Sequence, residues 1–204
     1  SKRMLVGLYG GTFDPVHVGH IHAALAVGRE LGLDQVRMVL AARPGHRGSP
    51  SGNAEHRWHM LCLACADHDE LIADDVELRR EGTSYTIDTV TDLRSTGALP
   101  CWILGQDAFA TLPVWHRWRE LLDFSNLVVV SRPGDLRAEP RVVQDVCAEH
   151  EVTCFDSSRI GQIYRVNEPM LEVSATQIRK KLATGESVQD LLADPVSNYI
   201  RANR

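Results

Sequence analysis

Two glycines and two histidines near the start of the chain have the types and spacing expected of a phosphate-binding turn. They are Gly10, Gly11, His17 and His20. Glycine permits close backbone approach and a positive φ, and the start of a following helix offers unpaired N–H groups to an anion. Either histidine alone would be interpreted as a helix cap, but residues three apart on a first helical turn point to one side. The combination predicts a polyphosphate cradle with two imidazole hydrogen-bond donors.

The flanking segments predict how this turn is held. Residues 4–9 form a short apolar run typical of a buried strand, residues 21–32 have the pattern of a helix, and residues 35–40 predict a second strand. This strand–helix–strand order indicates a parallel sheet, and ligands bind at the carboxyl ends of such strands. We expect an α/β fold with the glycine turn at that edge.

The run from Gly10 to His20 resembles the His-x-Gly-His signature of the nucleotidyltransferase superfamily, in its nicotinate-nucleotide adenylyltransferase form. Similar elements continue to about Ile200. The resemblance implies a Rossmann-like nucleotidyltransferase fold, with a mostly parallel sheet and helices on both faces. Residues 1–204 would form a single domain, on which a small helical segment of about residues 174–204 packs.

The reaction implied by this resemblance is transfer of the adenylyl group of ATP to nicotinate mononucleotide, in NAD biosynthesis. The products are nicotinate adenine dinucleotide and pyrophosphate. The attacking phosphate has a second pKa of about 6, so it is largely ionised near neutral pH. Neither a protein nucleophile nor a general base is required, and positioning and electrostatics supply the rate. Mg²⁺ would arrive with ATP, held mostly by phosphate oxygens and water.

The resemblance also implies an ATP side of the site. His17 and His20 would donate to the ATP phosphates, and Arg179 would steady the β and γ groups. Ser174, with Gln177 three residues later, fits the capping box of a helix whose open N–H groups suit phosphate. The remaining ATP-side residues are Gly10, Gly11, Thr12, Phe13, Gly105, Asp107 and Thr176.

A second half-site would hold the mononucleotide. Trp115 offers a stacking face, although an isolated tryptophan is more often buried core. The helix start at Ser84, Tyr85 and Thr86 would give main-chain N–H groups to the nicotinate carboxylate, with Thr83 or Ser84 as N-cap. By resemblance, phosphate contacts come from His46, Arg47 and Arg132. Gly45 stands where the family has a proline, which we expect to loosen the loop of residues 41–53.

Further segments complete the expected sheet and helices. Extended segments are expected at residues 71–74, 76–79, 101–104, 127–130, 152–155 and 162–166. Helices are expected at residues 54–66, 85–93, 137–150 and 195–201. Within the first of these helices, Cys62 and Cys65 match a C-x-x-C pair with His59 and His68 nearby. A zinc site is the alternative, but a helix there makes small core thiols the favoured interpretation.

Composition limits the classes of function. A net charge of −5 over 204 residues argues against a surface that coats nucleic acid, so phosphate binding is expected to be local. With no apolar stretch long enough for a bilayer and five scattered cysteines, a cytoplasmic location is the default expectation.

Four alternatives stay open at this point. The acceptor could be nicotinamide mononucleotide or phosphopantetheine, and the chain could be a nucleotide-binding regulator without catalysis. A nicotinamide-dependent oxidoreductase is disfavoured because the chain has no GxGxxG motif followed by a ribose-binding acid. Monomer and homo-oligomer are not distinguished.

Overall fold

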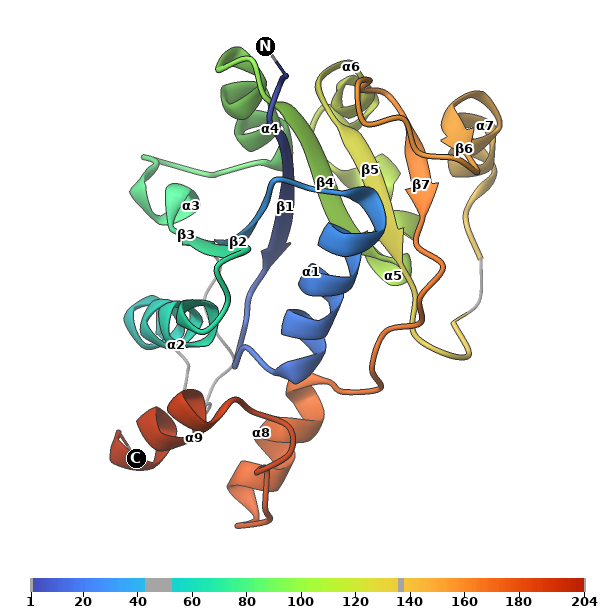
Figure 1. Cartoon of the computed structure of the whole chain (residues 1–204). Helices are drawn as coiled ribbons and strands as arrows, with labels where there is room; N and C mark the ends of the chain where they lie inside the picture. Colours follow the sequence, from blue (N-terminus) through green and yellow to red (C-terminus); the bar gives the residue numbers. More distant parts are fainter. Residues whose placement is uncertain (1, 43–52, 136–137, 204) are drawn as a thin grey trace.

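The computed structural model describes residues 2–42, 53–135 and 138–203. Within these ranges the strands form one sheet in the order β3-β2-β1-β4-β5-β7-β6, and every pairing is parallel (Figure 1). The strands are β1 (Leu5–Gly11), β2 (Gln35–Leu40), β3 (Leu71–Asp74), β4 (Leu99–Gly105), β5 (Asn126–Val130), β6 (Glu151–Val152) and β7 (Ile163–Arg165). The expected α/β class with a parallel sheet is confirmed.

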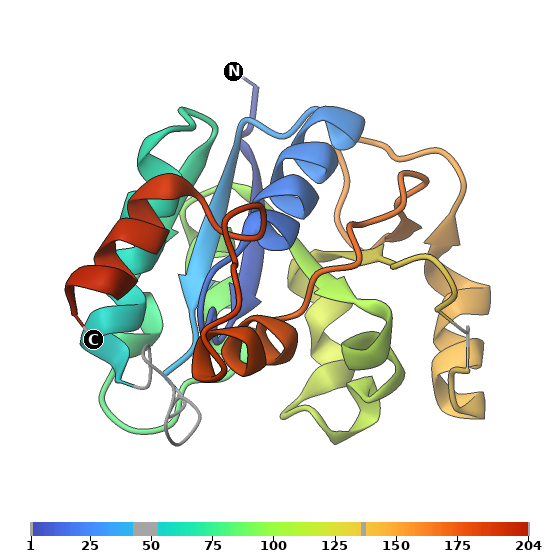
Figure 2. The ribbon, with the colours of Figure 1, turned by 90° about the horizontal axis from the view of Figure 1, so that it is seen from below.

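The helices lie on both faces of this sheet (Figure 2). One face is covered by α1 (Val18–Leu31), α2 (Ala54–Ala66), α8 (Ala175–Ala183) and α9 (Asp194–Ala202). The other is covered by α4 (Thr86–Ser95), α5 (Gln106–Ala110), α6 (Leu121–Phe124) and α7 (Arg141–His150). Shorter helices are α3 (Val76–Arg79) and the 3₁₀ turns η1 (Leu112–Val114) and η2 (Trp118–Glu120).

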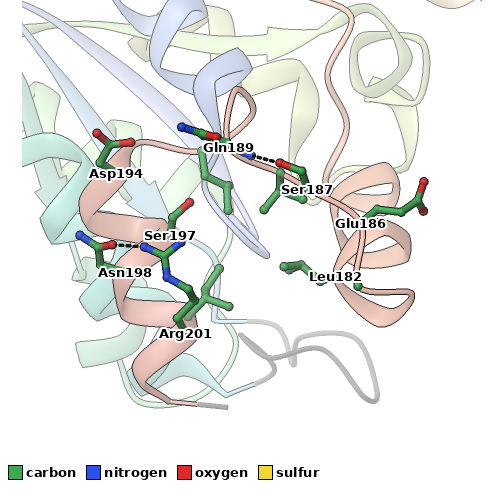
Figure 3. A pocket seen from close by; sticks show the side chains of 12 residues that line it. Leu182, Glu186, Ser187, Gln189, Asp194, Ser197, Asn198 and Arg201 are labelled. Atoms are coloured by element: carbon green, nitrogen blue, oxygen red, sulfur yellow. Dashed lines mark hydrogen bonds between the residues drawn. The ribbon is translucent and has the colours of Figure 1, made fainter.

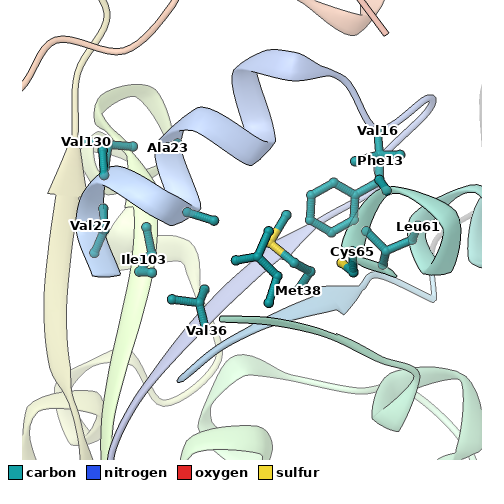
Figure 4. Packing of buried hydrophobic residues seen from close by; sticks show 14 of the residues in the cluster. Phe13, Val16, Ala23, Val27, Val36, Met38, Leu61, Cys65, Ile103 and Val130 are labelled. Carbon is teal, nitrogen blue, oxygen red and sulfur yellow. The ribbon is translucent and has the colours of Figure 1, made fainter. Parts of the chain in front are cut away.

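Two buried clusters follow from the alternation of side chains along the strands. Leu5 packs into the cluster beneath α1 and α2, while its neighbour Val6 packs into the cluster beneath α4 and α5. Figure 4 shows the first cluster, where Phe13 and Met38 lie among the side chains of α1 and α2. Cys65 is part of this core, as expected, and burial raises the pKa of its thiol to about 12.

The order of the strands reverses at β1 and β4. From β1 the chain proceeds outward through β2 and β3, and it then returns to place β4 on the other side of β1. The carboxyl ends of β1 and β4 therefore border a crevice of the kind in which open α/β sheets bind ligands.

Several boundaries differ from the expectations. Residues 76–79 are helical rather than extended, because the Asp74 carboxylate accepts the Val76 N–H at 2.9 Å and Arg79 bonds back to Asp75 at 2.7 Å. α1 begins at Val18 because His17 caps it. The strand expected at residues 152–155 shortens to β6. α7 begins after Pro140, whose missing N–H suits a helix start.

The basic segment with Gly45, His46 and Arg47 lies outside the described residues. Across the described ranges, no helix combines the length and the apolar character needed to cross a bilayer.

Candidate active site

His17 and His20 form a reciprocal cap at the start of α1. The Nδ1 atom of His17 accepts the N–H groups of Gly19 at 3.0 Å and His20 at 3.4 Å, and Nδ1 of His20 accepts the His17 N–H at 3.1 Å. A ring nitrogen that accepts carries no proton, so each neutral imidazole holds its proton on Nε2. The cap therefore fixes both tautomers and leaves each ring with one directed N–H donor.

Both rings are neutral near pH 7. Burial lowers the pKa of His17 to about 4, and the positive charge of Arg132 acts in the same direction. Burial, followed by the neighbouring His17, holds the pKa of His20 well below its ordinary value. The two rings stack at 3.6 Å between centroids, an arrangement in which two imidazolium charges would repel.

The first turn of α1 does not offer the unpaired N–H groups that the sequence suggested. His17 occupies the N–H groups of Gly19 and His20, and Val18 N–H donates to the Leu191 carbonyl at 3.0 Å. The expectation of open N–H groups is wrong, because the His17 side chain and the Leu191 carbonyl accept the hydrogen bonds of the N–H groups at the helix start. Donors to an anion at α1 are the imidazole Nε2–H groups instead.

The glycine turn also works differently from expectation. Neither Gly10 nor Gly11 takes a positive φ; Phe13 does so, at 48°. A Cβ on Gly10 would lie 2.7 Å from the Trp102 ring, so glycine serves close packing there. Phe13 is 2% exposed, and its ring packs edge-on against His20 at 4.9 Å between centroids.

Two cavities meet at the carboxyl ends of β1 and β4. The first, here called the histidine cavity, has a volume of about 360 Å³, and its lining includes the predicted residues His17, His20, Gly105, Asp107, Arg132 and Ser174. The second, the tryptophan cavity, has a volume of about 830 Å³ and includes Gly10, Gly11, Ser84, Tyr85, Thr86, Gly105 and Trp115. Both are lined by Tyr9, Gly105 and Ala108, so they adjoin.

Three of the predicted residues are divided between the two cavities. Gly10 and Gly11 line the tryptophan cavity. Arg132 lines the histidine cavity, away from Trp115. Arg132 follows β5, whose carboxyl end lies beyond that of β4, so sheet order places it on the histidine side.

The tryptophan cavity is bounded by α4 on one side and by the segment after η1 on the other. Trp115 is half-buried rather than core, and its indole N–H donates to the Thr111 hydroxyl at 3.3 Å. The Tyr85 ring stacks on His116 at 4.1 Å, which links the two walls. His116 was not among the predicted residues.

The N-cap of α4 is Tyr85, not Thr83 or Ser84. The Ser84 hydroxyl instead accepts from Arg80 at 2.6 Å, and Arg80 also pairs with Asp92 at 2.7 Å. Arg80 is thus engaged by neighbouring side chains. Thr86 begins α4 and lines the tryptophan cavity. The Tyr85 N–H, which was expected to be open, instead donates to the Asp88 carboxylate at 3.2 Å.

Arg179 reaches the turn from α8. Its Nη1 donates to the Asp14 carbonyl at 2.8 Å and its Nη2 to the Thr176 hydroxyl at 3.1 Å. The predicted N-cap Ser174 is confirmed, since its hydroxyl accepts the Gln177 N–H at 3.1 Å. Among the described residues, the N–H groups of Ala175 and Thr176 have no partner, so α8 presents the open helix start that α1 does not.

Arg57 is a further residue at this site that the sequence did not single out. It is 1% exposed and donates to the carbonyls of Thr12 at 3.0 Å and Ala41 at 3.1 Å. Its only sequence signal is a charge on the apolar side of a helical pattern, beside Met60 and Leu61.

In the described part of the chain, no group of three or more His, Cys, Asp or Glu side chains could hold a metal ion. Cys62 and Cys65 lie on α2, with Cys65 buried and Cys62 half-buried. A magnesium ion at this site would depend on phosphate oxygens and water for its ligands.

A third cavity lies between α8 and α9 (Figure 3) and has a volume of about 520 Å³. Its polar lining includes an Arg201–Asn198 hydrogen bond and Ser187, whose hydroxyl accepts the Gln189 N–H at 3.4 Å. None of the residues predicted from the sequence lines it.

Comparison with known proteins identifies relatives of this chain. Residues 8–181 match the model of the cytidylyltransferase-like family. A protein of Aeromonas hydrophila named "Probable nicotinate-nucleotide adenylyltransferase" is 40% identical, over 96% of this chain and 94% of its own. A Pseudomonas aeruginosa protein of the same name is 42% identical, over 97% of this chain and 95% of its own.

Solved structures share the fold. Plasmodium falciparum nicotinic acid mononucleotide adenylyltransferase complexed with NaAD superposes with a TM-score of 0.72 at 15% identity, covering 98% of this chain and 96% of that chain. The same protein complexed with APC gives a TM-score of 0.73. The chain belongs to the nicotinate-nucleotide adenylyltransferase family, within the cytidylyltransferase-like proteins.

Proposed function

We propose that this chain transfers the adenylyl group of ATP to nicotinate mononucleotide, giving nicotinate adenine dinucleotide and pyrophosphate. The observation that carries the proposal is the pair of adjoining cavities, which have Tyr9, Gly105 and Ala108 in common. One cavity contains two directed imidazole donors, and the other has an indole face and a helix start. Such a pair suits two nucleotides that meet at one phosphate.

The chemistry requires little from side chains beyond positioning and charge. An ionised oxygen of the mononucleotide phosphate attacks the α-phosphorus of ATP, the bond to the β-phosphate breaks, and pyrophosphate leaves with the electron pair. No proton has to be removed from the nucleophile. The Nε2–H groups of His17 and His20 would direct the phosphates, while Arg132 and Arg179 add positive charge and α8 adds open N–H groups.

We propose that Mg²⁺ accompanies ATP as the expected cofactor. Magnesium keeps several waters and is bound through substrate phosphates in many nucleotide enzymes. Asp107 lines the histidine cavity, and by resemblance its carboxylate serves ribose hydroxyls rather than the metal. The ion would supply neutralisation of the triphosphate charge.

Selectivity for the acid over the amide follows from the wall at α4. The neighbouring cation Arg80 is engaged by Ser84, Thr89 and Asp92, so a carboxylate at the Thr86 helix start would be held by main-chain N–H groups. An amide there would turn an NH₂ donor toward a donor, at a cost of about 1–3 kcal/mol per unpaired group. Two or three such contributions predict a preference for nicotinate mononucleotide on the order of 10³-fold.

The test is the ratio of kcat/KM for nicotinate and nicotinamide mononucleotides at fixed ATP, followed by pyrophosphate release. Phosphopantetheine serves as a third acceptor, and thermal unfolding verifies that the protein is folded. A ratio near one, or a preference for the amide, would contradict the acid assignment while leaving adenylyl transfer intact. A folded protein that binds ATP but turns over no acceptor would support the regulator alternative.

A further inference from the structure

Arg57 is a buried guanidinium that faces main-chain carbonyls of the site rather than a cavity. It extends from α2, and its Nη1 donates to the carbonyls of Thr12 and Ala41 at 3.0 and 3.1 Å. Burial lowers the pKa of Arg57, and the nearby Asp14 carboxylate opposes this. An arginine keeps its charge under both influences. One cation therefore bridges the carboxyl-side turns of β1 and β2.

The two carbonyls that it holds determine the direction of two N–H groups. In a planar trans peptide the C=O and the following N–H point in opposite directions. A Thr12 carbonyl fixed on Arg57 therefore directs the N–H of Phe13 to the opposite side. The Ala41 carbonyl does the same for Ala42, which lines the tryptophan cavity.

The turn is held from its other end by Arg179. The Asp14 carbonyl accepts from Arg179 at 2.8 Å, so the residue between the two fixed carbonyls is Phe13, in its left-handed conformation with φ 48°. A non-glycine residue in this region requires surroundings that determine its conformation. The Phe13 ring in turn packs edge-on against His20 at 4.9 Å. Arg57 is thus connected to the histidine pair through one residue.

We propose that Arg57 is a positioning residue for adenylyl transfer, which holds the turn at Thr12 and the wall at Ala41 in one register while touching neither substrate. This inference rests on the proposed function, because it assigns Arg57 to the same site. It predicts that losing the guanidinium disorders the geometry of both half-sites together. The stability of the fold alone would not account for that effect.

The experiment compares Arg57→Ala, Arg57→Lys and a matched control. Leu61→Ala removes a fully buried side chain from the same helix and lowers Tm, but it removes no hydrogen bond to either carbonyl. We expect kcat of Arg57→Ala to fall about 10²-fold, by more than either KM rises, while Leu61→Ala stays within about twofold of the parent. Arg57→Lys should recover part of this loss, since an ammonium can still donate to a carbonyl.

Two readouts separate positioning from stability. Millimolar guanidinium should restore turnover to Arg57→Ala and have no such effect on Leu61→Ala. Hydrogen exchange at the Ala41 N–H, which donates to the Gly11 carbonyl at 2.8 Å, should be faster in Arg57→Lys than in Leu61→Ala, at temperatures equally far below each Tm. If Arg57→Ala does not fold, the lysine variant supplies both the kinetic and the exchange comparison.

The inference is overturned if folded Arg57 variants turn over like Leu61→Ala, or if exchange at the Ala41 N–H matches that control. Parent protein that shows no adenylyl transfer would instead contradict the proposed function. In that case the exchange comparison still decides whether Arg57 holds the two turns, so the two failures are distinguishable.

Discussion

His17 and His20 each accept the backbone N–H of the other through Nδ1, and their rings stack at 3.6 Å with the planes inclined by 23°. This reciprocity makes the two histidines one unit. Each ring orients the other, and each is left with a single Nε2–H on a residue that lines the histidine cavity. A change at either position therefore affects both donors.

Removing one of these donors is expected to reduce turnover with the fold intact. His20→Ala should lose on the order of 10²-fold or more in kcat, as for loss of a donor that acts on transition-state charge. His22→Ala is the matched control, since His22 lies on α1 but does not line the histidine cavity. Steady-state kinetics with circular dichroism as a folding check decides the point. If His20→Ala turns over like the parent, His20 has no catalytic role.

The lowered histidine pKa values predict a stability that depends on pH. The unfolded chain takes up a proton near pH 6.5, whereas folded His17 does so only at about pH 4. Stability is thus fully present above pH 6.5 and decreases as pH falls toward 4, by about 1.4 kcal/mol per pH unit for each such histidine.

Urea unfolding at several pH values, in the parent and in His17→Asn, measures this contribution. Asparagine is a good N-cap that does not titrate, so the free energy of unfolding of His17→Asn should decrease less steeply below pH 6.5 than that of the parent. Equal slopes in the two proteins would show that folded His17 titrates like an unfolded histidine.

The sequence predicted the strands and the histidine pair because their signals are local. Residues 4–9 are large and apolar except for Gly7, and His17 and His20 are separated by about one helical turn. Hydrogen bonds between groups that are far apart in the sequence could not be predicted. Nothing near Val18 indicates that its N–H will bond to Leu191, so the helix start was predicted to be open.

Arg57 and residues 76–79 illustrate the same limit in two ways. Arg57 is one charge in a helical pattern, and only the folded chain places it between the carbonyls of Thr12 and Ala41. At residues 76–79, short-range capping by Asp74 outweighed an extended pattern. The assignments to His46 and Arg47 stay predictions, because both residues lie outside the described ranges.

Arg179→Ala should weaken the binding of ATP more than the binding of the mononucleotide. The residue lies in α8, whose start lines the histidine cavity, and it holds the Asp14 carbonyl at 2.8 Å. Lys180→Ala, an exposed cation on the same helix, is the control. Calorimetric titration of each variant with ATP and with nicotinate mononucleotide gives the comparison. Equal losses for both ligands would show that α8 does not address ATP specifically.

Trp115→Leu should raise KM for the mononucleotide and leave KM for ATP nearly unchanged. Loss of an aromatic stacking partner is worth about 0.5–1.5 kcal/mol, or roughly 2- to 10-fold in KM. Trp118→Leu tests a neighbouring indole that does not line the tryptophan cavity. If the two variants behave alike, Trp115 contributes packing rather than recognition.

The contacts of α8 and Leu191 with the start of the chain bear on when activity can arise during synthesis. The Arg179 side chain donates to the Asp14 carbonyl, which lies 165 positions earlier in the sequence. The Val18 N–H donates to the carbonyl of Leu191. A growing polypeptide can build β1, α1 and β2 early, but its first helix stays incompletely satisfied until these late segments leave the ribosome. Chains whose synthesis stops before Leu191 would contain most of the sheet but would lack a complete phosphate site. Activity is therefore expected only in chains whose translation has continued at least to Leu191.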